Sequence, residues 1–301
     1  MKFKFEENIF KWASKTASLC VVALTISIVV VLIKESWLAI KTFKFDFWTT
    51  KIWDPVFENF GALPFAYGTL LTSLLAVAIS LPISIGFALF CVEYAPEKIK
   101  DFFITTTSLI ASIPSVIFGL WGIFVLGPFL QNFILPLTER TIGFLPFFQG
   151  HNVRFSYLTA TIILSIMITP TITSIAIEAF QTVSKNLKDS LYSLGATKWE
   201  MIRYALLKTT KTTIFAATIL GFGRAVGETM ATAMVIGNVP IISTSLFSAG
   251  STIASAIANE FTEATTDIYL SSLFYLAMVL FFITLATNFI AKFLLKNWIK
   301  R

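Results

Sequence analysis

Runs of about 20 apolar residues recur along the chain, and they constrain its fold more than any other feature. A helix needs about 20 residues to cross the bilayer, because the hydrocarbon core is roughly 30 Å thick and each residue adds about 1.5 Å. The runs lack a period-two alternation, and backbone polar groups in lipid must be paired within the chain, so helices are favoured over a barrel. We predict an all-α integral membrane protein with six transmembrane helices, at approximately residues 18–40, 66–92, 103–130, 156–177, 213–237 and 269–292.

Composition and charge agree with a membrane protein. Hydrophobic residues make up 56% of the chain and charged residues 13%, against roughly 25% charged in a soluble domain. The net charge is +6, but most of the 23 Lys and Arg fall on one side of the predicted spans: the N-terminus, the loop near Lys98, the segment Lys185 to Lys211 and the C-terminal tail. Positive residues favour the cytoplasmic side, so both termini are expected there, and the basicity indicates topology rather than nucleic-acid binding.

Little in the sequence suggests catalysis or a bound cofactor. Cys20 and Cys91 lie far apart in apolar runs, so they define neither a disulfide framework nor a metal site. His151 is the only histidine and is expected to be a solvated residue of an external loop. No G-x-x-x-x-G-K-[ST] motif occurs, so the chain is not expected to bind or hydrolyse ATP itself.

The longest internal segment on the basic side is residues 178–212, and its pattern is helical. Leu187, Leu191 and Leu194 follow i, i+4, i+7 spacing and predict one apolar stripe. Gly195 follows at once as a C-terminal cap.

A second helix is predicted directly after this glycine. Thr197-x-x-Glu200 is a capping box, in which each side chain pairs with a free amide at the helix start. The resulting helix–turn–helix either lies along the inner leaflet or inserts as a rigid knob into a groove of a cytoplasmic partner. Two caps in succession favour the knob.

Two charges interrupt the fifth predicted span. Arg224 lies near its middle, where a charge is costly and normally faces protein or water rather than lipid. Glu228 lies one turn later, so we predict that the two side chains share a face and form an ion pair among small residues. The G-x-x-x-G of Gly223 and Gly227 is interpreted as a helix-packing motif, and a dinucleotide loop is disfavoured because no strand precedes it.

The charge pair has two interpretations. In the first, it is a buried ion pair that fixes helix packing. In the second, Arg224 binds a passing anion, since a guanidinium donates two parallel hydrogen bonds to an oxyanion, and Glu228 neutralises it between passages.

Three further features are less specific. Pro114 is expected to kink the third predicted span. The external stretches 131–155 and 239–268 are either interfacial or partner-facing structure, or ordinary loops. Glu260, Glu263 and Asp267 are expected to belong to a solvated cluster at a helix end rather than to an ion trap.

The segment LKDSLYSLGATKWEMIRYALLK resembles the cytoplasmic loop of ABC importer permeases, with its pattern E-A-A, three residues, Gly, nine residues, I-x-L-P. Gly195 matches the central glycine and Asp189 takes the place of the Glu. The two Ala are replaced, and in the final I-x-L-P the Ile is replaced by Ala205 and Leu-Pro by Leu207-Lys208. The resemblance implies that this loop docks into an ATPase subunit. The residues assigned to coupling are Asp189, Leu191, Leu194, Gly195, Ala196, Thr197 and Glu200.

Four stretches together resemble the PstC-type permeases of bacterial phosphate ABC importers, which are binding-protein-dependent inner membrane components: GFGRAVGETMATAMVIGN, ASIPSVIFGLWGIFVLGP at 111–128, LGATKWEMIR and IANEFTEA at 257–264. The resemblance covers about residues 65–293. It implies a type I ABC importer permease fold in the bacterial cell membrane and a role for Arg224 and Glu228 in phosphate passage.

The resemblance also implies the domain organisation and the partners. The expected parts are an N-terminal segment with the first helix and an external loop, the permease domain with its coupling loop, and a basic tail: 1–64, 65–293 with 178–212, and 294–301. Expected partners are a homologous sister permease, a cytoplasmic ATPase dimer that binds ATP and Mg, an extracytoplasmic phosphate-binding protein and membrane lipids. The alternatives are the sister permease itself, a related oxyanion permease, or an autonomous channel or secondary transporter.

Overall fold

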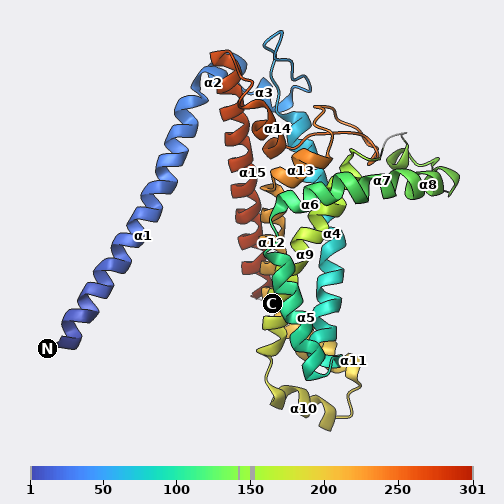
Figure 1. The fold of residues 1–301 in the computed structure, drawn as a ribbon. Helices are drawn as coiled ribbons and strands as arrows, with labels where there is room; N and C mark the ends of the chain where they lie inside the picture. Colours follow the sequence, from blue (N-terminus) through green and yellow to red (C-terminus); the bar gives the residue numbers. More distant parts are fainter. Residues whose placement is uncertain (1, 142, 150–152, 300–301) are drawn as a thin grey trace.

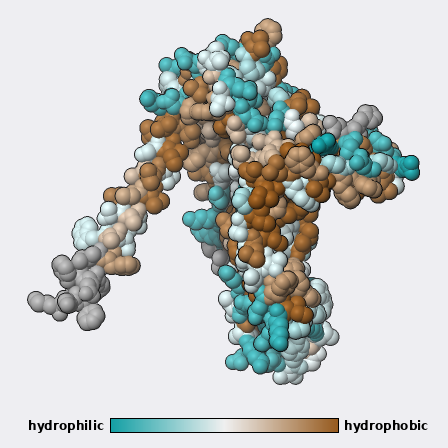
Figure 2. Space-filling model, viewed as in Figure 1, coloured by the Kyte–Doolittle hydropathy of each residue, from teal (hydrophilic) through white to brown (hydrophobic). Residues whose placement is uncertain are grey.

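The computed structural model describes residues 2–141, 143–149 and 153–299, and side chains between residues 10 and 296 of these ranges. Regular structure in the described residues is helical, with two isolated β-bridges and no strand. His151, predicted to be a solvated loop residue, lies outside the described residues. Figure 2 shows apolar side chains over the middle of the molecule and hydrophilic ones toward its two ends, as a membrane protein requires.

The body of the molecule is a bundle built around α9 (Tyr157–Gln181). Beside it run α4 (Leu63–Leu89), α5 (Glu97–Ala111), α12 (Lys208–Val226) and α15 (Asp267–Ile299) (Figure 1). Helix α9 packs against α4, α5 and α12. Its apolar window is therefore 67% buried, against 28% for that of α4, and α9 forms the core of the fold.

Aromatic packing closes the end of the bundle at which α15 begins. There lie α2 (Trp37–Phe43), α3 (Asp46–Thr49) and α14 (Ile253–Glu260). Phe47 stacks on Tyr275 with ring centres 4.1 Å apart, and Trp53 meets Phe60 and Phe65 edge-on at 4.8 and 4.9 Å. These rings join the N-terminal region to α4 and α15.

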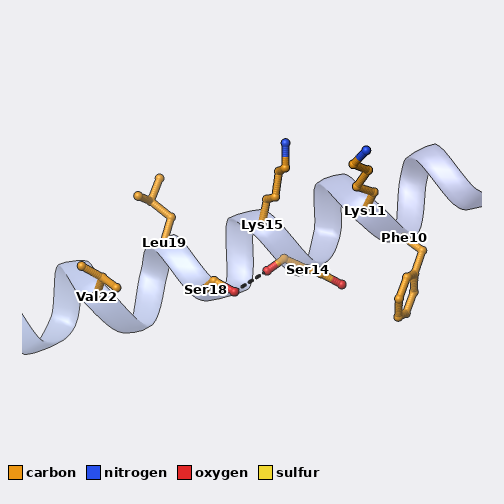
Figure 3. Close-up of a pocket in the computed structure, with 7 residues that line it drawn as sticks. All are labelled: Phe10, Lys11, Ser14, Lys15, Ser18, Leu19 and Val22. Carbon is orange, nitrogen blue, oxygen red and sulfur yellow. Dashed lines mark hydrogen bonds between the residues drawn. The ribbon is translucent and has the colours of Figure 1, made fainter.

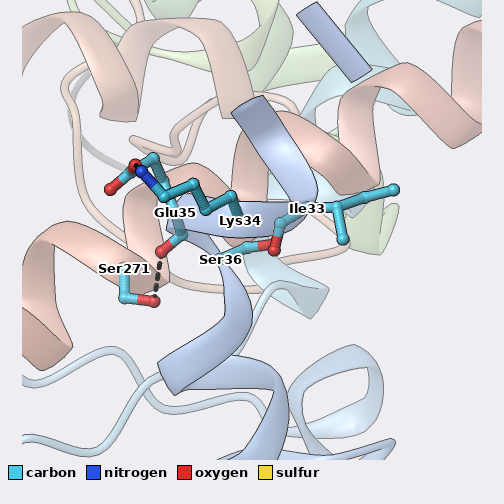
Figure 4. A network of polar contacts seen from close by, with 5 residues as sticks. All are labelled: Ile33, Lys34, Glu35, Ser36 and Ser271. Carbon is cyan, nitrogen blue, oxygen red and sulfur yellow. Dashed lines mark hydrogen bonds and ion pairs between the residues drawn. The ribbon is translucent and has the colours of Figure 1, made fainter. Parts of the chain in front are cut away.

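Helix α1 (Lys2–Glu35) diverges from the bundle (Figure 1), and none of its apolar window is buried. It is anchored at its C-terminal end by Ser271 of α15 (Figure 4). The Ser271 hydroxyl donates to the Glu35 carbonyl at 2.6 Å and accepts from the Ala39 amide at 3.1 Å. The first predicted span, 18–40, is thus wrong at its end, because the chain turns at Ser36 from α1 into α2.

The third predicted span, 103–130, is also wrong. Helix α5 ends at Ala111, and a separate helical segment begins at Ser115 and runs to Thr141, lying across the bundle in Figure 1. Pro114 separates them instead of kinking one helix, because proline lacks an amide hydrogen and excludes helical geometry from the residue before it. The segment consists of α6 (Ser115–Trp121), η2 (Gly122–Leu126), α7 (Gly127–Phe129), η3 (Leu130–Ile134) and α8 (Leu135–Thr141).

The fifth predicted span, 213–237, is broken as well. Helix α12 ends at Val226, and α13 (Met230–Val235) starts after three non-helical residues. By length and composition, five helices of the described chain could cross a membrane, and α12 is not among them: Phe10–Glu35, Leu63–Tyr94, Ser115–Thr141, Tyr157–Gln181 and Asp267–Lys296.

The two long external stretches pack on each other. The Leu246 amide donates to the carbonyl of Phe147, in the short helix η4 (Pro146–Phe148), at 2.9 Å. Two tyrosines of the bundle hold the second stretch. The Tyr67 hydroxyl donates to the Ser243 carbonyl at 2.7 Å, and the Tyr157 hydroxyl donates to the Ile241 carbonyl at 2.9 Å. In their described residues, these stretches are ordered structure rather than ordinary loops.

At the opposite end lie α10 (Lys185–Ser193), α11 (Lys198–Met201) and η5 (Ile202–Leu207), which leads into α12.

Candidate functional site

Arg224 lies in a groove of about 540 Å³ between α9, α12 and α15. Its guanidinium donates to the Thr171 hydroxyl of α9 at 2.8 Å, and Asn288 of α15 lines the same groove. The groove is lined by Thr171, Ala216, Ile219, Leu220, Gly223, Arg224 and Asn288. A guanidinium carries five N–H donors, and among the described residues this half-buried one is bonded to a single hydroxyl, so donors remain for a ligand in the groove.

The predicted ion pair between Arg224 and Glu228 is wrong for the described residues. Because α12 ends at Val226, Glu228 does not follow Arg224 along one helical face. Its carboxylate instead accepts from the Ala231 amide at 3.2 Å, in the first turn of α13. A carboxylate satisfies a free amide there and complements the positive end of the helix, so local capping replaces the ion pair.

The glycines of α12 divide between a packed and an open side. A Cβ on Gly221 would lie 2.8 Å from the Ile172 side chain, so this glycine allows α12 to approach α9 closely. A Cβ on Gly223 would meet nothing within 4 Å among the described residues, and Gly227 lies past the helix end. Within the described chain, the predicted packing role therefore belongs to Gly221 rather than to Gly223 and Gly227.

A second hollow, of about 780 Å³, lies along α1 (Figure 3). Its lining comes from one helix alone, with Lys11 and Lys15 beside Leu19. The Ser18 hydroxyl bonds to the Ser14 carbonyl of its own helix at 2.8 Å. Because no second element faces it in the described chain, this hollow does not form a substrate site.

The predicted turn between α10 and α11 is confirmed in detail. Gly195 has a φ of +82°, the left-handed conformation that glycine adopts without a steric penalty. The Gly195 amide donates to the Tyr192 carbonyl at 2.9 Å, and the Ala196 amide donates to the Leu191 carbonyl at 3.1 Å. These are the two hydrogen bonds of a Schellman motif. Asp189 is exposed, and its carbonyl accepts from the Ser193 hydroxyl at 2.9 Å.

The predicted capping box is also present. The Thr197 hydroxyl accepts from the Glu200 amide at 3.3 Å, and the Glu200 carboxylate accepts from the Thr197 amide at 2.8 Å. The Thr197 hydroxyl also donates to the Glu200 carboxylate, at 2.8 Å. The bonds that the carboxylate accepts from the Thr197 amide and, second, from the Thr197 hydroxyl lower the pKa of Glu200. The two caps define the helix–turn–helix of α10 and α11, which we call the knob.

The three leucines of the predicted apolar stripe do not all face the same way. Leu191 packs into a buried cluster that includes Cys91, Met201 and Ile202. Leu187 and Leu194 are 40% and 84% exposed. The stripe thus fixes the knob to the membrane bundle and still presents apolar side chains outward.

Three polar residues of these regions were not singled out from the sequence. Thr171, which bonds to Arg224, and Asn288, which lines the same groove, are brought there by the packing of three helices, and each appears in the sequence as a polar residue in an apolar run. Glu93, in the helical turn Phe90–Tyr94 that follows α4, bonds to Lys188 of α10. The signal for it was weak, an acidic residue directly after an apolar span.

Glu260 departs from its prediction as a solvated residue. Its carboxylate is partly buried and accepts from the Trp53 indole at 2.6 Å and from the Tyr269 hydroxyl at 2.7 Å. Burial raises the pKa of Glu260, although both hydrogen bonds oppose the shift. Glu260 therefore belongs to the aromatic closure of the bundle.

Sequence comparisons place the chain among transport permeases. It is 42% identical over 298 residues to "Phosphate transport system permease protein PstC" of Mesorhizobium japonicum, covering 98% of this chain and 91% of that protein. It is 44% identical over 253 residues to the protein of the same name from Xylella fastidiosa, covering 83% and 78%. The corresponding protein of Haemophilus influenzae is 40% identical over 92% of this chain and 89% of its own length.

Solved structures with a similar fold are permeases of ABC importers. A chain of the MetNI methionine ABC transporter in an inward-facing conformation matches with a TM-score of 0.59 at 15% identity, covering 82% of this chain and 99% of that one. A chain of a bacterial alginate ABC transporter, in complex with an alginate pentasaccharide-bound periplasmic protein, matches with a TM-score of 0.62 at 17% identity, covering 95% and 96%. The fold is that of the type I ABC importer permeases.

Residues 80–300 match the family described as "Binding-protein-dependent transport system inner membrane component". With that match over most of the chain and the extended identity to PstC proteins, this chain is a PstC-type member of the binding-protein-dependent inner membrane component family.

Proposed function

We propose that this chain is the permease subunit of an ATP-driven importer and forms part of the translocation path for inorganic phosphate. The observation that carries the proposal is Arg224, whose guanidinium faces a groove and, among the described residues, has a hydroxyl rather than a carboxylate as its partner. A permanently charged, planar donor suits a tetrahedral oxyanion. The names of the sequence relatives support phosphate as that oxyanion.

The groove is open on one side, and the proposal assigns that side to a homologous permease, so that the path lies between two subunits. Leu220 is 56% exposed at its edge, and Gly223 presents bare backbone there. Charged side chains of membrane proteins normally face protein or water, and an exposed groove edge of this kind can be covered by either.

The knob of α10 and α11 is assigned to a cytoplasmic ATPase, which binds ATP and Mg. Leu187, Leu194 and Trp199 protrude from it with exposed fractions of 40%, 84% and 62%. These side chains suit a hydrophobic groove, the usual receptor for a short capped helix. Closure of the ATPases would move the knob and change the access of the Arg224 groove from the outer to the inner side.

Delivery is assigned to an extracytoplasmic phosphate-binding protein. The exposed acidic residues Glu263 and Asp267 would repel free phosphate at the outer end of the bundle. A carrier protein that neutralises the anion overcomes this repulsion.

Reconstitution separates this function from that of an autonomous channel or secondary transporter. The tagged chain is purified with and without its co-purifying subunits, placed in liposomes, and assayed for uptake of labelled phosphate. We expect uptake only with the complete complex, the binding protein and ATP. Uptake by the chain alone, without ATP, would contradict the proposal.

A further inference from the structure

The cytoplasmic end of α4 contacts both arms of the knob. After Leu89 the helix widens into a π-helical turn, η1 (Phe90–Tyr94), a distortion often found at functional positions. The Glu93 carboxylate accepts from Lys188 of α10 at 2.5 Å. The Glu93 carbonyl accepts from Lys198 of α11 at 2.7 Å.

A third contact completes this arrangement. The Lys198 ammonium lies 3.8 Å from the ring centre of Tyr94, within cation–π range. Lys188 and Lys198 flank the Gly195 turn, one on each arm, and both converge on two consecutive residues of η1. We call this set the clamp: Glu93, Tyr94, Lys188 and Lys198.

The ion pair of the clamp is shielded from water. The Glu93 and Lys188 side chains are only 11% and 19% exposed, whereas the pair of Lys34 and Glu35 on α1 is 79% and 42% exposed. Exposed pairs contribute little to stability, but removing one partner of a shielded pair leaves an uncompensated charge. The Glu93 pair therefore favours one position of α10 relative to α4.

Helix α4 leads from the clamp to the groove. It packs along α9, which provides Thr171, and against α12, which provides Arg224. A displacement of the knob is thereby delivered to the two helices that form the groove, through a salt bridge and packed helices.

We propose that Glu93 is a positioning residue whose ion pair with Lys188 clamps the knob to α4 and transmits movement of the ATPase to the Arg224 groove. The inference rests on the proposed function, since the knob must engage the ATPase. It goes beyond the docking of the knob on the ATPase, because it assigns the transmission of the ATPase movement to an ion pair within this chain.

The test measures phosphate imported per ATP hydrolysed by the complete transporter in liposomes. Glu93→Gln and Lys188→Met should each retain the ATPase and its hydrolysis but lower this ratio roughly fivefold or more, because coupling between two sites of a protein typically amounts to a fivefold effect or larger. The exchanged pair, Glu93→Lys with Lys188→Glu, should recover much of the ratio. Lys185→Met removes a charge from the exposed start of the same helix and should leave the ratio unchanged.

A second measurement does not depend on the ATPase. Spin labels at Glu97→Cys and Ser193→Cys, in a Cys20→Ser background, report the distance between the start of α5 and the end of α10 in the purified chain. Glu93→Gln should broaden this distance distribution, and the exchanged pair should narrow it again.

The outcomes separate the two proposals. An unchanged import ratio in Glu93→Gln, or an unchanged distance distribution, would overturn the clamp. An exchanged pair no better than the single variants would overturn it as well. Failure of the unmodified chain to retain any ATPase would instead overturn the proposed docking, while the distance measurement still decides the clamp.

Discussion

The Thr171 hydroxyl of α9 accepts a hydrogen bond from the Arg224 guanidinium of α12 at 2.8 Å. This bond fixes where the guanidinium points, so it belongs to the orientation of the proposed anion site. A hydrogen bond to a charged group contributes about 1.5 to 3 kcal/mol.

We expect Thr171→Val to lower phosphate uptake at limiting phosphate roughly tenfold, because the isosteric side chain cannot accept the bond. Thr171→Ser keeps the hydroxyl and should transport nearly normally. Labelled-phosphate uptake in cells that depend on this transporter measures both. Equal uptake in the valine and serine variants would show that Thr171 does not orient Arg224.

The turn requires glycine at position 195 because of its backbone conformation, and not because a side chain there would clash. A Cβ there would meet no atom within 4 Å, but the φ of +82° is unfavourable for a β-branched residue. Gly195→Val should therefore distort the turn and release or uncouple the ATPase, whereas Gly195→Asn, which tolerates this conformation, should not. Co-purification of the ATPase and its stimulated hydrolysis measure the difference, and full retention with normal stimulation in the valine variant would contradict the docking role.

At the scale of elements, the break between α12 and α13 determines how the two charges act. Glu228 caps α13, and Arg224 faces the groove from the end of α12. The two side chains should be energetically independent.

A double-mutant cycle tests this independence. We expect Arg224→Gln and Glu228→Gln to change the free energy of unfolding additively, with a coupling below about 0.5 kcal/mol. Denaturant unfolding of the detergent-solubilised chain measures the cycle. A coupling above about 1 kcal/mol would restore the ion pair that the sequence predicted.

How far the sequence predicts the structure depends on the range of the deciding interactions. The turn at Gly195 and the capping box at Thr197 use partners within a few residues, so their pattern is sufficient. After the break at Val226, the Glu228 carboxylate can either cap the next helix or pair with Arg224. The spacing of apolar residues does not show which of the two bonds forms. Thr171 and Asn288 come to the Arg224 groove only through the packing of three helices, so no local pattern predicts them.

At the scale of the whole molecule, the bundle is closed at one end by aromatic rings around Glu260 and connected to the knob at the other. Glu260 joins Trp53 to Tyr269, and burial raises the pKa of its carboxyl. An acid with a raised pKa in the folded state binds more protons folded than unfolded between its two pKa values. Its contribution to stability therefore falls as pH rises through that interval.

We expect the chain in detergent to lose thermal stability as pH rises from the ordinary carboxyl pKa through the raised one, and Glu260→Gln to flatten this dependence. The amide oxygen still accepts from Trp53 and Tyr269, so the variant removes the titration and keeps the contacts. The unfolding temperature as a function of pH measures the effect. An identical profile in the glutamine variant would exclude Glu260 as its source.

The chain also exposes surfaces that a lone soluble protein would bury. Helix α1 leaves its apolar window uncovered by the rest of the chain, and the Arg224 groove opens at the side of the bundle. The proposed function assigns lipid and partner subunits to these surfaces, so transport is to be measured in the complete transporter.

The central claim is that phosphate passes Arg224. The most direct measurement is ATP-dependent phosphate uptake by the reconstituted complex bearing Arg224→Leu, with subunit composition checked in parallel. The account predicts an intact complex whose uptake falls roughly a hundredfold or more, because a charged anion loses its bidentate donor. Uptake at the unmodified rate by an intact Arg224→Leu complex would contradict it.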